Sequence, residues 1–151
     1  MLHAAPPTWT LPSTLSILTQ TGISTYKRRK ILQLKRAYKV CAAIDWAEAE
    51  RAGVYTGAPV DRADGFIHLS TGDQVAETLR RHFAGRTGLV LVALDIEKLG
   101  EAVRWEPSRG GALFPHVYGL LPAAAAISVM PVPDDADARS AFAAHLHAGA
   151  S

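Results

Sequence analysis

The stretch GFIHLSTGDQVAETLRRHF, residues 65–83, has the pattern of a β-strand that runs directly into an α-helix. Apolar and polar side chains alternate through its first six residues, as they do in a strand with one buried face. Thr71 followed three residues later by Gln74 is a helix-start signal. An apolar stripe at helical spacing follows, formed by Val75, Leu79 and Phe83, and we expect these three side chains in the core.

A second strand-to-helix unit precedes this stretch. The segment AYKVCAA, residues 37–43, has the composition of a buried or edge strand. Asp45 with Glu48 predicts a capping box, and Gly53 predicts the end of that helix. Residues 54–64 show no periodicity and are expected to form an irregular surface loop.

The second half of the chain adds further strands at irregular spacing. The apolar run LVLVALDI, residues 89–96, is predicted as a central strand buried on both faces. Shorter strands are expected at 103–106 and 125–132, and an amphipathic helix at 134–147. Irregularly spaced strands with only two or three helices favour an α+β class with a mixed sheet over a doubly wound parallel one.

Composition limits the class of protein. A chain of 151 residues with 48% hydrophobic and 20% charged residues is typical of one globular domain. Cys41 is the only cysteine, which excludes an intramolecular disulfide framework. A reducing compartment is therefore indicated, and we expect the protein to be cytoplasmic.

Charge divides the chain into residues 1–36 and 37–151. The first part holds six basic residues and no acidic ones, whereas the second holds ten basic against fourteen acidic residues, a net charge of −4. A domain of that sign is a poor candidate for nucleic-acid binding. Within the first part, the stretch LPSTLSILTQTGIS, residues 11–24, is too polar and too short to cross a membrane. The composition of the first part overlaps with that of organelle transit peptides. We expect a disordered basic extension followed by the folded domain.

One candidate site lies at the end of the strand in GFIHLST. His68 and Ser70 share a strand face just before the helix start at Thr71, where backbone N–H groups and the helix dipole favour an anion. A phosphorylated ligand would fit there. The alternative is structural, with a hydroxyl capping the helix and His68 making a structural hydrogen bond.

A second candidate site lies in RWEPSRGGALFPHVYG, residues 104–119. It gathers polar and aromatic groups that can stack on a ring, pair with phosphate or move a proton, namely Trp105, Glu106, Arg109, His116 and Tyr118. Taken singly, each also suits an ordinary hairpin. By parity, His116 and His68 are predicted to face a common cleft, with their imidazoles within roughly 10 Å.

Other kinds of site receive little support. His68, His116, Asp64 and Glu106 could ligate zinc, but their spacing matches no metal motif and we expect no metal. Cys41 lies among apolar strand residues and is expected to be an inert buried thiol. The dinucleotide-fold fingerprint and the P-loop motif are both absent.

The two motifs also carry a resemblance to a known family. The matching residues are YKV at 38–40, Trp46, Gly53, Tyr55, DGFIHLST at 64–71, Asp95, Trp105, Glu106 and FPHVYG at 114–119. With this set, residues 38–132 resemble the family labelled DUF952, a domain of unknown function. Its members typically begin at the first strand, so residues 1–36 lie outside the family pattern.

The resemblance implies a fold similar to that of ADP-ribosyltransferases, a small split β-sheet, mixed or antiparallel, with flanking helices that bind NAD in a cleft. The HLS element is similar to a strand of RNA 2'-phosphotransferases, which consume NAD while removing a phosphate. NAD or a related nucleotide is therefore the expected small-molecule ligand, and ADP-ribose transfer the expected reaction. The expected catalytic residues are His68, Glu106 and His116, and the expected ligand-binding residues are Tyr55, Asp64, Ser70, Thr71, Trp105, Arg109 and Tyr118.

One departure from this group favours a different function. The histidine that ADP-ribosyltransferases carry on their first strand has no counterpart in AYKVCAA. The alternative is a non-catalytic module that binds a small ligand or a partner on the same fold. Both hypotheses predict a pocket, and release of nicotinamide from NAD separates them.

Overall fold

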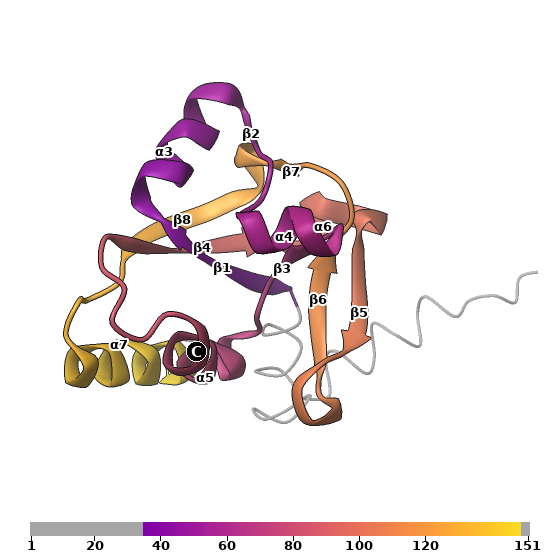
Figure 1. Cartoon of the computed structure of the whole chain (residues 1–151). Helices are drawn as coiled ribbons and strands as arrows, with labels where there is room; N and C mark the ends of the chain where they lie inside the picture. The colour runs from indigo at the N-terminus through magenta and orange to yellow at the C-terminus, as the bar shows by residue number, and fades with distance from the viewer. Residues whose placement is uncertain (1–34, 149–151) are drawn as a thin grey trace, which may run out of the picture. The chain divides into compact units, whose positions relative to one another are not determined.

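The computed structural model describes residues 35–148 (Figure 1). The strands of this range are β1 (Arg36–Ala42), β2 (Val54–Tyr55), β3 (Ile67–His68), β4 (Leu89–Asp95), β5 (Val103–Pro107), β6 (Leu113–Val117), β7 (Leu121–Pro122) and β8 (Ala126–Pro131). Its α-helices are α3 (Ala43–Ala52), α4 (Pro59–Asp64), α5 (Val75–His82), α6 (Ile96–Leu99) and α7 (Ala136–Ala148). Short 3-10 helices are η2 (Gly72–Gln74), η3 (Gly100–Ala102), η4 (Arg109–Gly111) and η5 (Ala123–Ala125). The predicted α+β class is confirmed.

The strands form two three-stranded sheets and one two-stranded sheet. Their orders are β1-β4-β8, β3-β6-β5 and β2-β7. Every pair within them is antiparallel, so the sheets are antiparallel rather than mixed. As predicted, β4 is the central strand of its sheet, and the 125–132 segment forms a strand, β8, which lies at the edge of that sheet.

A pair of backbone hydrogen bonds joins the two larger sheets. Tyr38 N–H donates to the Ser70 carbonyl at 2.8 Å, and Ser70 N–H donates to the Tyr38 carbonyl at 2.9 Å. One residue earlier, Leu69 N–H donates to the Pro115 carbonyl at 3.0 Å. The GFIHLST segment is therefore held between β1 and β6, and it brings the two motifs of the sequence together.

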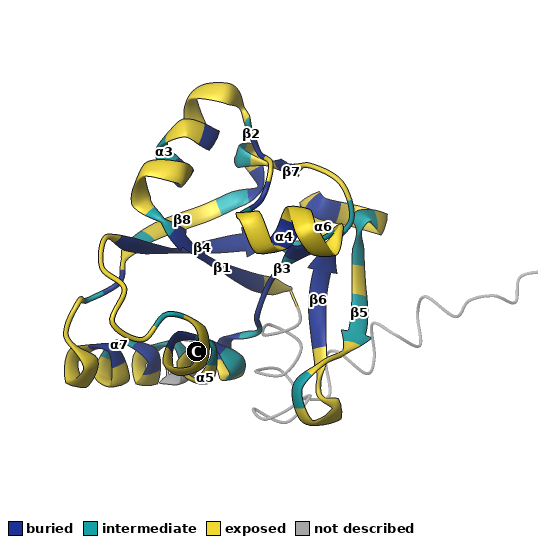
Figure 2. Cartoon of the chain, viewed as in Figure 1, coloured by how far each residue is buried: buried dark blue, intermediate teal, exposed yellow. Residues whose placement is uncertain are grey.

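Alternation along β1 and β4 sends side chains into two apolar clusters on opposite faces of the sheet. One face packs against α5 and α7, through Leu89, Leu91 and Ala93 of β4. The other packs against α3 and the smaller elements, through Val90, Val92 and Leu94. Figure 2 shows the resulting pattern, in which the central strands are buried and β8 is largely exposed. Cys41 lies in the second cluster, where it is 3% exposed.

Helix α3 begins earlier than predicted. Its N-cap is Ala42, which makes no capping side-chain bond, and Asp45 lies in the first turn. The sheet fixes this start, since Ala43 N–H donates to the Gly88 carbonyl at 2.8 Å directly after β1. Gly53 ends the helix in a left-handed conformation, as predicted. Trp46, only 2% exposed, anchors the helix in the core.

The surface loop predicted for residues 54–64 is wrong. The segment forms strand β2 and helix α4, in which Asp61 is buried. Pro59 and Asp61 form a helix-start signal of their own, because proline suits a first helical turn and a carboxylate there accepts backbone N–H groups. Six helical residues are too few for a visible apolar stripe, which explains why periodicity missed them.

The expected apolar stripe of Val75, Leu79 and Phe83 is confirmed in part, and the expected extension at residues 1–36 is not tested. Val75 and Leu79 are buried as predicted, but Phe83 is only partly buried against the same cluster. The predicted disordered extension at residues 1–36 falls almost wholly outside the described residues. Within the described range, no helix combines the length and apolarity that a membrane crossing requires.

Candidate functional site

Helix α4 places a buried carboxylate beside the strand that carries His68. The Asp61 side chain is 1% exposed and accepts hydrogen bonds on both oxygens. Oδ2 accepts from Lys39 Nζ at 2.7 Å and from the Ala58 N–H at 2.8 Å. Oδ1 accepts from the backbone N–H of His68 at 3.0 Å and faces its ring nitrogen Nδ1 at 2.7 Å. Four donors therefore surround one buried charge.

Lys39 is the second buried charge of this group. It interrupts the apolar strand β1, its side chain is 5% exposed, and it shares a strand face with Ala37 and Cys41, on the side of the sheet that packs against α3. Nζ also donates to the His68 carbonyl at 3.2 Å. Lys39 and Asp61 thus hold the backbone and the ring of His68 from one side.

The pKa of Asp61 is held well below its ordinary value. Burial alone would raise the pKa of this carboxyl, because it disfavours the charge. The hydrogen bonds from His68 and the charge of Lys39 outweigh that effect. Asp61 is therefore a carboxylate at neutral pH, and Nδ1 of His68 donates to it.

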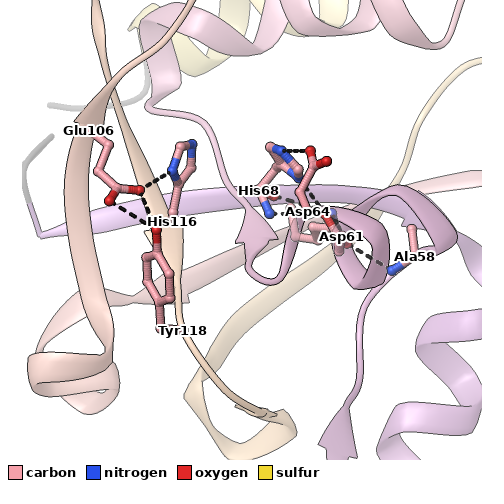
Figure 3. A network of polar contacts seen from close by, with 8 residues as sticks. Ala58, Asp61, Asp64, His68, Glu106, His116 and Tyr118 are labelled. Carbon is pink, nitrogen blue, oxygen red and sulfur yellow. Dashed lines mark hydrogen bonds and ion pairs between the residues drawn. The ribbon is translucent and has the colours of Figure 1, made fainter.

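His68 lies between two carboxylates, as Figure 3 shows. Its Nε2 is 3.0 Å from Oδ2 of Asp64, one turn along α4 from Asp61. The His68 side chain is 36% exposed and Asp64 47% exposed, so this side of the ring is open to solvent. An imidazole can donate to both carboxylates only when both of its nitrogens carry hydrogen.

The second histidine has a similar partner on the neighbouring strands. His116 of β6 places Nδ1 2.7 Å from Oε2 of Glu106 on β5. The Tyr118 hydroxyl donates to both oxygens of Glu106 at 2.9 Å. The hydrogen bonds from His116 and then Tyr118 lower the pKa of Glu106, and the bond to Glu106 raises the pKa of Tyr118. With Nδ1 donating, Nε2 of a neutral His116 carries a free lone pair.

The sheet brings the two histidines together in an edge-to-face contact. His68 and His116 are directly paired in the β3–β6 register, and their ring centroids lie 5.4 Å apart. Phe66 fixes the cluster, since it stacks on His116 at 4.2 Å and lies 4.7 Å from His68. The predicted proximity of the two imidazoles is confirmed.

Both histidines line one cavity of about 500 Å³. Volumes of this size are typical of pockets for small-molecule ligands. Its polar and charged lining residues are Lys39, Asp61, Asp64, His68, Ser70, Thr78, His82, Arg86, Ser108, Arg109 and His116, and its apolar ones are Tyr38, Val40, Val60, Leu69, Phe83 and Phe114. The cavity thus lies between the two predicted motifs.

Five of the ten predicted site residues line this cavity, namely Asp64, His68, Ser70, Arg109 and His116. Glu106 and Tyr118 do not line it and instead hold His116. The other three, Tyr55, Thr71 and Trp105, lie elsewhere. Tyr55 is buried in the core with its ring 5.8 Å from that of Trp46. The Thr71 N–H donates to Oε1 of Gln74 at 3.0 Å, so the predicted anion site at this helix start has lost that donor.

The sequence interpretation missed Lys39 and Asp61. Lys39 could have been recognised as a charged residue on the inner face of an otherwise apolar strand. Asp61 could have been recognised from the helix-start signal at Pro59. Thr78, Arg86 and Phe114 reach the cavity through tertiary structure alone. Among the described residues, no three His, Cys, Asp or Glu side chains are grouped as a metal site would require.

The chain is similar to proteins of known structure. A family model described as "Protein of unknown function (DUF952)" matches residues 40–129. A crystal structure of protein CC0527 from Caulobacter crescentus is 41% identical, with a TM-score of 0.67, over 72% of this chain and 98% of that chain. A solution NMR structure of CC0527 is 43% identical, with a TM-score of 0.61, over 69% and 90% respectively. The search of curated proteins found no match.

Proposed function

The chain belongs to the DUF952 family, which is described as of unknown function, and we propose that this domain binds NAD or a related nucleotide in the cavity lined by His68 and His116. The observation that carries the proposal is the histidine pair itself. Two imidazoles 5.4 Å apart face one cavity, and each has Nδ1 2.7 Å from a carboxylate. Pairs of this kind orient a ring nitrogen toward a ligand.

The walls of the cavity support a ligand that is both planar and polar. Apolar side chains, among them Tyr38, Leu69 and Phe114, alternate with hydroxyl and charged groups around it. A nucleotide offers a planar base, ribose hydroxyls and phosphates to such a mixture. In this assignment His68 and Ser70 bind the ribose or a phosphate, and Asp64 faces the ligand beside His68.

The reaction we propose is the transfer of ADP-ribose within an ADP-ribosyltransferase-like fold. The bond between ribose C1′ of NAD and the nicotinamide nitrogen breaks, and nicotinamide leaves with the bonding electrons. An acceptor hydroxyl forms the new bond to C1′, and its proton passes to Nε2 of His116. Glu106 holds Nδ1–H of His116 at 2.7 Å and stabilises the imidazolium that forms.

One observation favours the alternative of a non-catalytic binding module. Both ring nitrogens of His68 face carboxylates, Asp61 at 2.7 Å and Asp64 at 3.0 Å. Carboxylates of the protein thus occupy both ring nitrogens, which leaves neither of them free to take a proton from a ligand. A histidine held in this way suits ligand binding without turnover.

Two measurements on the full chain test the proposal. NAD and ADP-ribose should raise the thermal unfolding midpoint, because a ligand that binds only the folded state stabilises it. Incubation with NAD should release nicotinamide. His116→Gln should abolish release, and His68→Ala should weaken binding by about 1–3 kcal/mol while the fold is retained. His145→Gln, at an exposed position of α7 outside the cavity lining, is the matched control.

The outcomes separate the two hypotheses. Stabilisation by either nucleotide without release of nicotinamide would support the non-catalytic module. No stabilisation by NAD or ADP-ribose at millimolar concentration would contradict nucleotide binding in either form.

A further inference from the structure

We infer that Arg109, Arg86 and the hydroxyl residues Thr78 and Ser108, which all line the cavity, form a phosphate-binding subsite, and that the ligand therefore carries a phosphate ester or diphosphate. The inference rests on the proposed function in taking this cavity as the ligand site. It goes further in naming the chemical group that the cavity selects and the side chains that bind it.

Arg109 is held in place but has an unused donor. Its Nη2 donates to Oγ1 of Thr78 at 2.9 Å, and its guanidinium lies 4.7 Å from the Phe114 ring centroid. The side chain is 21% exposed. Nη1 is buried and has no hydrogen-bond partner among the described residues. A buried donor without an acceptor is costly, and a shift of this partly exposed side chain toward the cavity would let Nη1 donate to a ligand oxygen.

The carboxylate nearest to this nitrogen is a weak partner. Oε2 of Glu77 lies 3.9 Å from Nη1 of Arg109, beyond hydrogen-bond distance. Glu77 is half exposed, and its other oxygen is shared by Arg80 and Arg81. The positive charge of Arg109 is therefore only partly compensated by the protein.

The acidic residues that line the cavity form no ion pair with the arginines that line it. Asp61 and Asp64 pair with Lys39 and His68, and neither forms an ion pair with a guanidinium. Arg86 has no ion-pair partner among the described residues, and its guanidinium lies 4.9 Å from the Phe83 ring centroid. Two arginines thus line one cavity with little compensating charge.

The lowered pKa of His82 is consistent with a cationic environment near Arg109. Burial, and then the charges of Arg109, Arg81 and His68, lower the pKa of His82. His82 belongs to helix α5, as does Thr78, and both line the cavity. A bound anion would partly neutralise the positive charges that lower the pKa of His82.

The hydroxyl groups make the subsite suited to phosphate rather than to a simple halide. Thr78 Oγ1 lies 3.0 Å from Oγ of Ser70, which is 4% exposed, so a hydrogen-bonded chain runs from Ser70 through Thr78 to Arg109. Ser108 adds a further hydroxyl to the lining. A phosphate has three oxygens that accept several donors at once, and arginine binds it through two parallel hydrogen bonds.

Calorimetric titration of the full chain with adenosine, ADP, inorganic pyrophosphate and NAD tests the subsite. ADP should bind more tightly than adenosine, and pyrophosphate alone should bind. Arg109→Gln should weaken ADP and pyrophosphate by about tenfold to a hundredfold, since one charge-assisted hydrogen bond is lost, and should leave adenosine unchanged. Arg86→Gln supplies a second test if Arg109→Gln does not fold. Arg80→Gln removes the same charge from α5 outside the cavity lining and is the control.

Each outcome bears on the subsite, and the two proposals can fail separately. Binding of ADP and pyrophosphate that depends on Arg109, with no binding of NAD, would support the subsite and overturn the NAD proposal. Binding of NAD or adenosine with no preference for ADP and no effect of Arg109→Gln or Arg86→Gln would overturn the subsite and leave nucleotide binding standing. No binding of any of the four probes would overturn both.

Discussion

At the scale of single residues, the site depends on a buried ion pair. Lys39 and Asp61 are 2.7 Å apart and almost wholly removed from solvent. Burial of two charges costs desolvation free energy that their attraction does not fully return. The pair nevertheless has a role in the site, because Asp61 orients both the ring and the backbone of His68.

Lys39→Met should destabilise the fold by about 3–5 kcal/mol, because it leaves the Asp61 charge buried without its partner. The double variant Lys39→Met, Asp61→Asn should lose less than the sum of the two single losses. Urea unfolding of the four proteins measures this coupling. Lys35→Met is the control, since its ion pair with Glu97 is exposed and should contribute about 0–1 kcal/mol. Additive losses would contradict the role assigned to the pair.

Asp61 should also dominate the acid sensitivity of the fold. Its folded-state pKa lies below the ordinary value of 3.8, so the charged carboxylate stabilises the fold at any pH above about 3.8. This stabilisation is lost as pH falls through the ordinary value towards the folded-state pKa. The stability difference between the natural chain and Asp61→Asn should therefore shrink from about pH 5 downwards. Denaturation at a series of pH values measures it, with exposed Glu101→Gln as the control; a constant difference would refute the assignment.

The polar residues of the two motifs were recognised from the sequence, whereas the buried charges outside these motifs were not. His68, His116, Glu106 and Arg109 stand out in sequence because polar groups cluster in two short motifs. Asp61 does not, because its role arises only when α4 folds against β1. Tyr55 was predicted to bind the ligand but lies in the core, because an aromatic residue beside a glycine-rich segment can suit either a pocket or a core.

At the scale of elements, segments with a hydrophobic pattern were predicted, and β2 and α4, which show none, were not. β1, β4 and the end of α3 follow from hydrophobic pattern and a C-terminal glycine. β2 and α4 have two and six residues, which is too short for either period to show. Tertiary contacts define these elements, and they are the ones that position Asp61.

The turn before α4 offers a test of this positioning. Gly57 has φ +104°, and a Cβ added there would lie 2.9 Å from the Cβ of Asp61. Gly57→Ala should cost about 2–4 kcal/mol, from backbone strain together with this clash. Gly85→Ala is matched, since φ is +74° and no atom lies within 4 Å of the added Cβ, so it should cost only about 1–2 kcal/mol. Urea unfolding measures both losses; equal losses would show that the Asp61 contact is unimportant.

At the scale of the whole molecule, the α+β class was predictable and the pairing of strands was not. The bridge between Tyr38 and Ser70 and the β3–β6 register join segments that sequence places far apart. The alternation of side chains along a strand predicts which neighbouring residues lie on the same face as each histidine. Only the register, set by tertiary packing, could place them opposite each other.

A chain beginning at Lys35 should fold with a stability within about 2 kcal/mol of the full chain. Both apolar clusters are built from elements between β1 and α7. Lys35 should be retained because its carbonyl accepts from Ile96 N–H at 3.0 Å. Guanidinium unfolding of the two proteins provides the comparison, and a larger loss would mean that residues before Lys35 contribute to the core.

The single cysteine has a practical consequence for work in solution. Burial raises the pKa of the Cys41 thiol to about 11, and its strand pairs with the central strand β4. We therefore expect the natural chain to be unreactive toward maleimide dyes and spin labels. A cysteine introduced on the exposed side of α4 or in η4, which both contribute lining residues to the cavity, could be labelled alone, and its signal would report ligand binding.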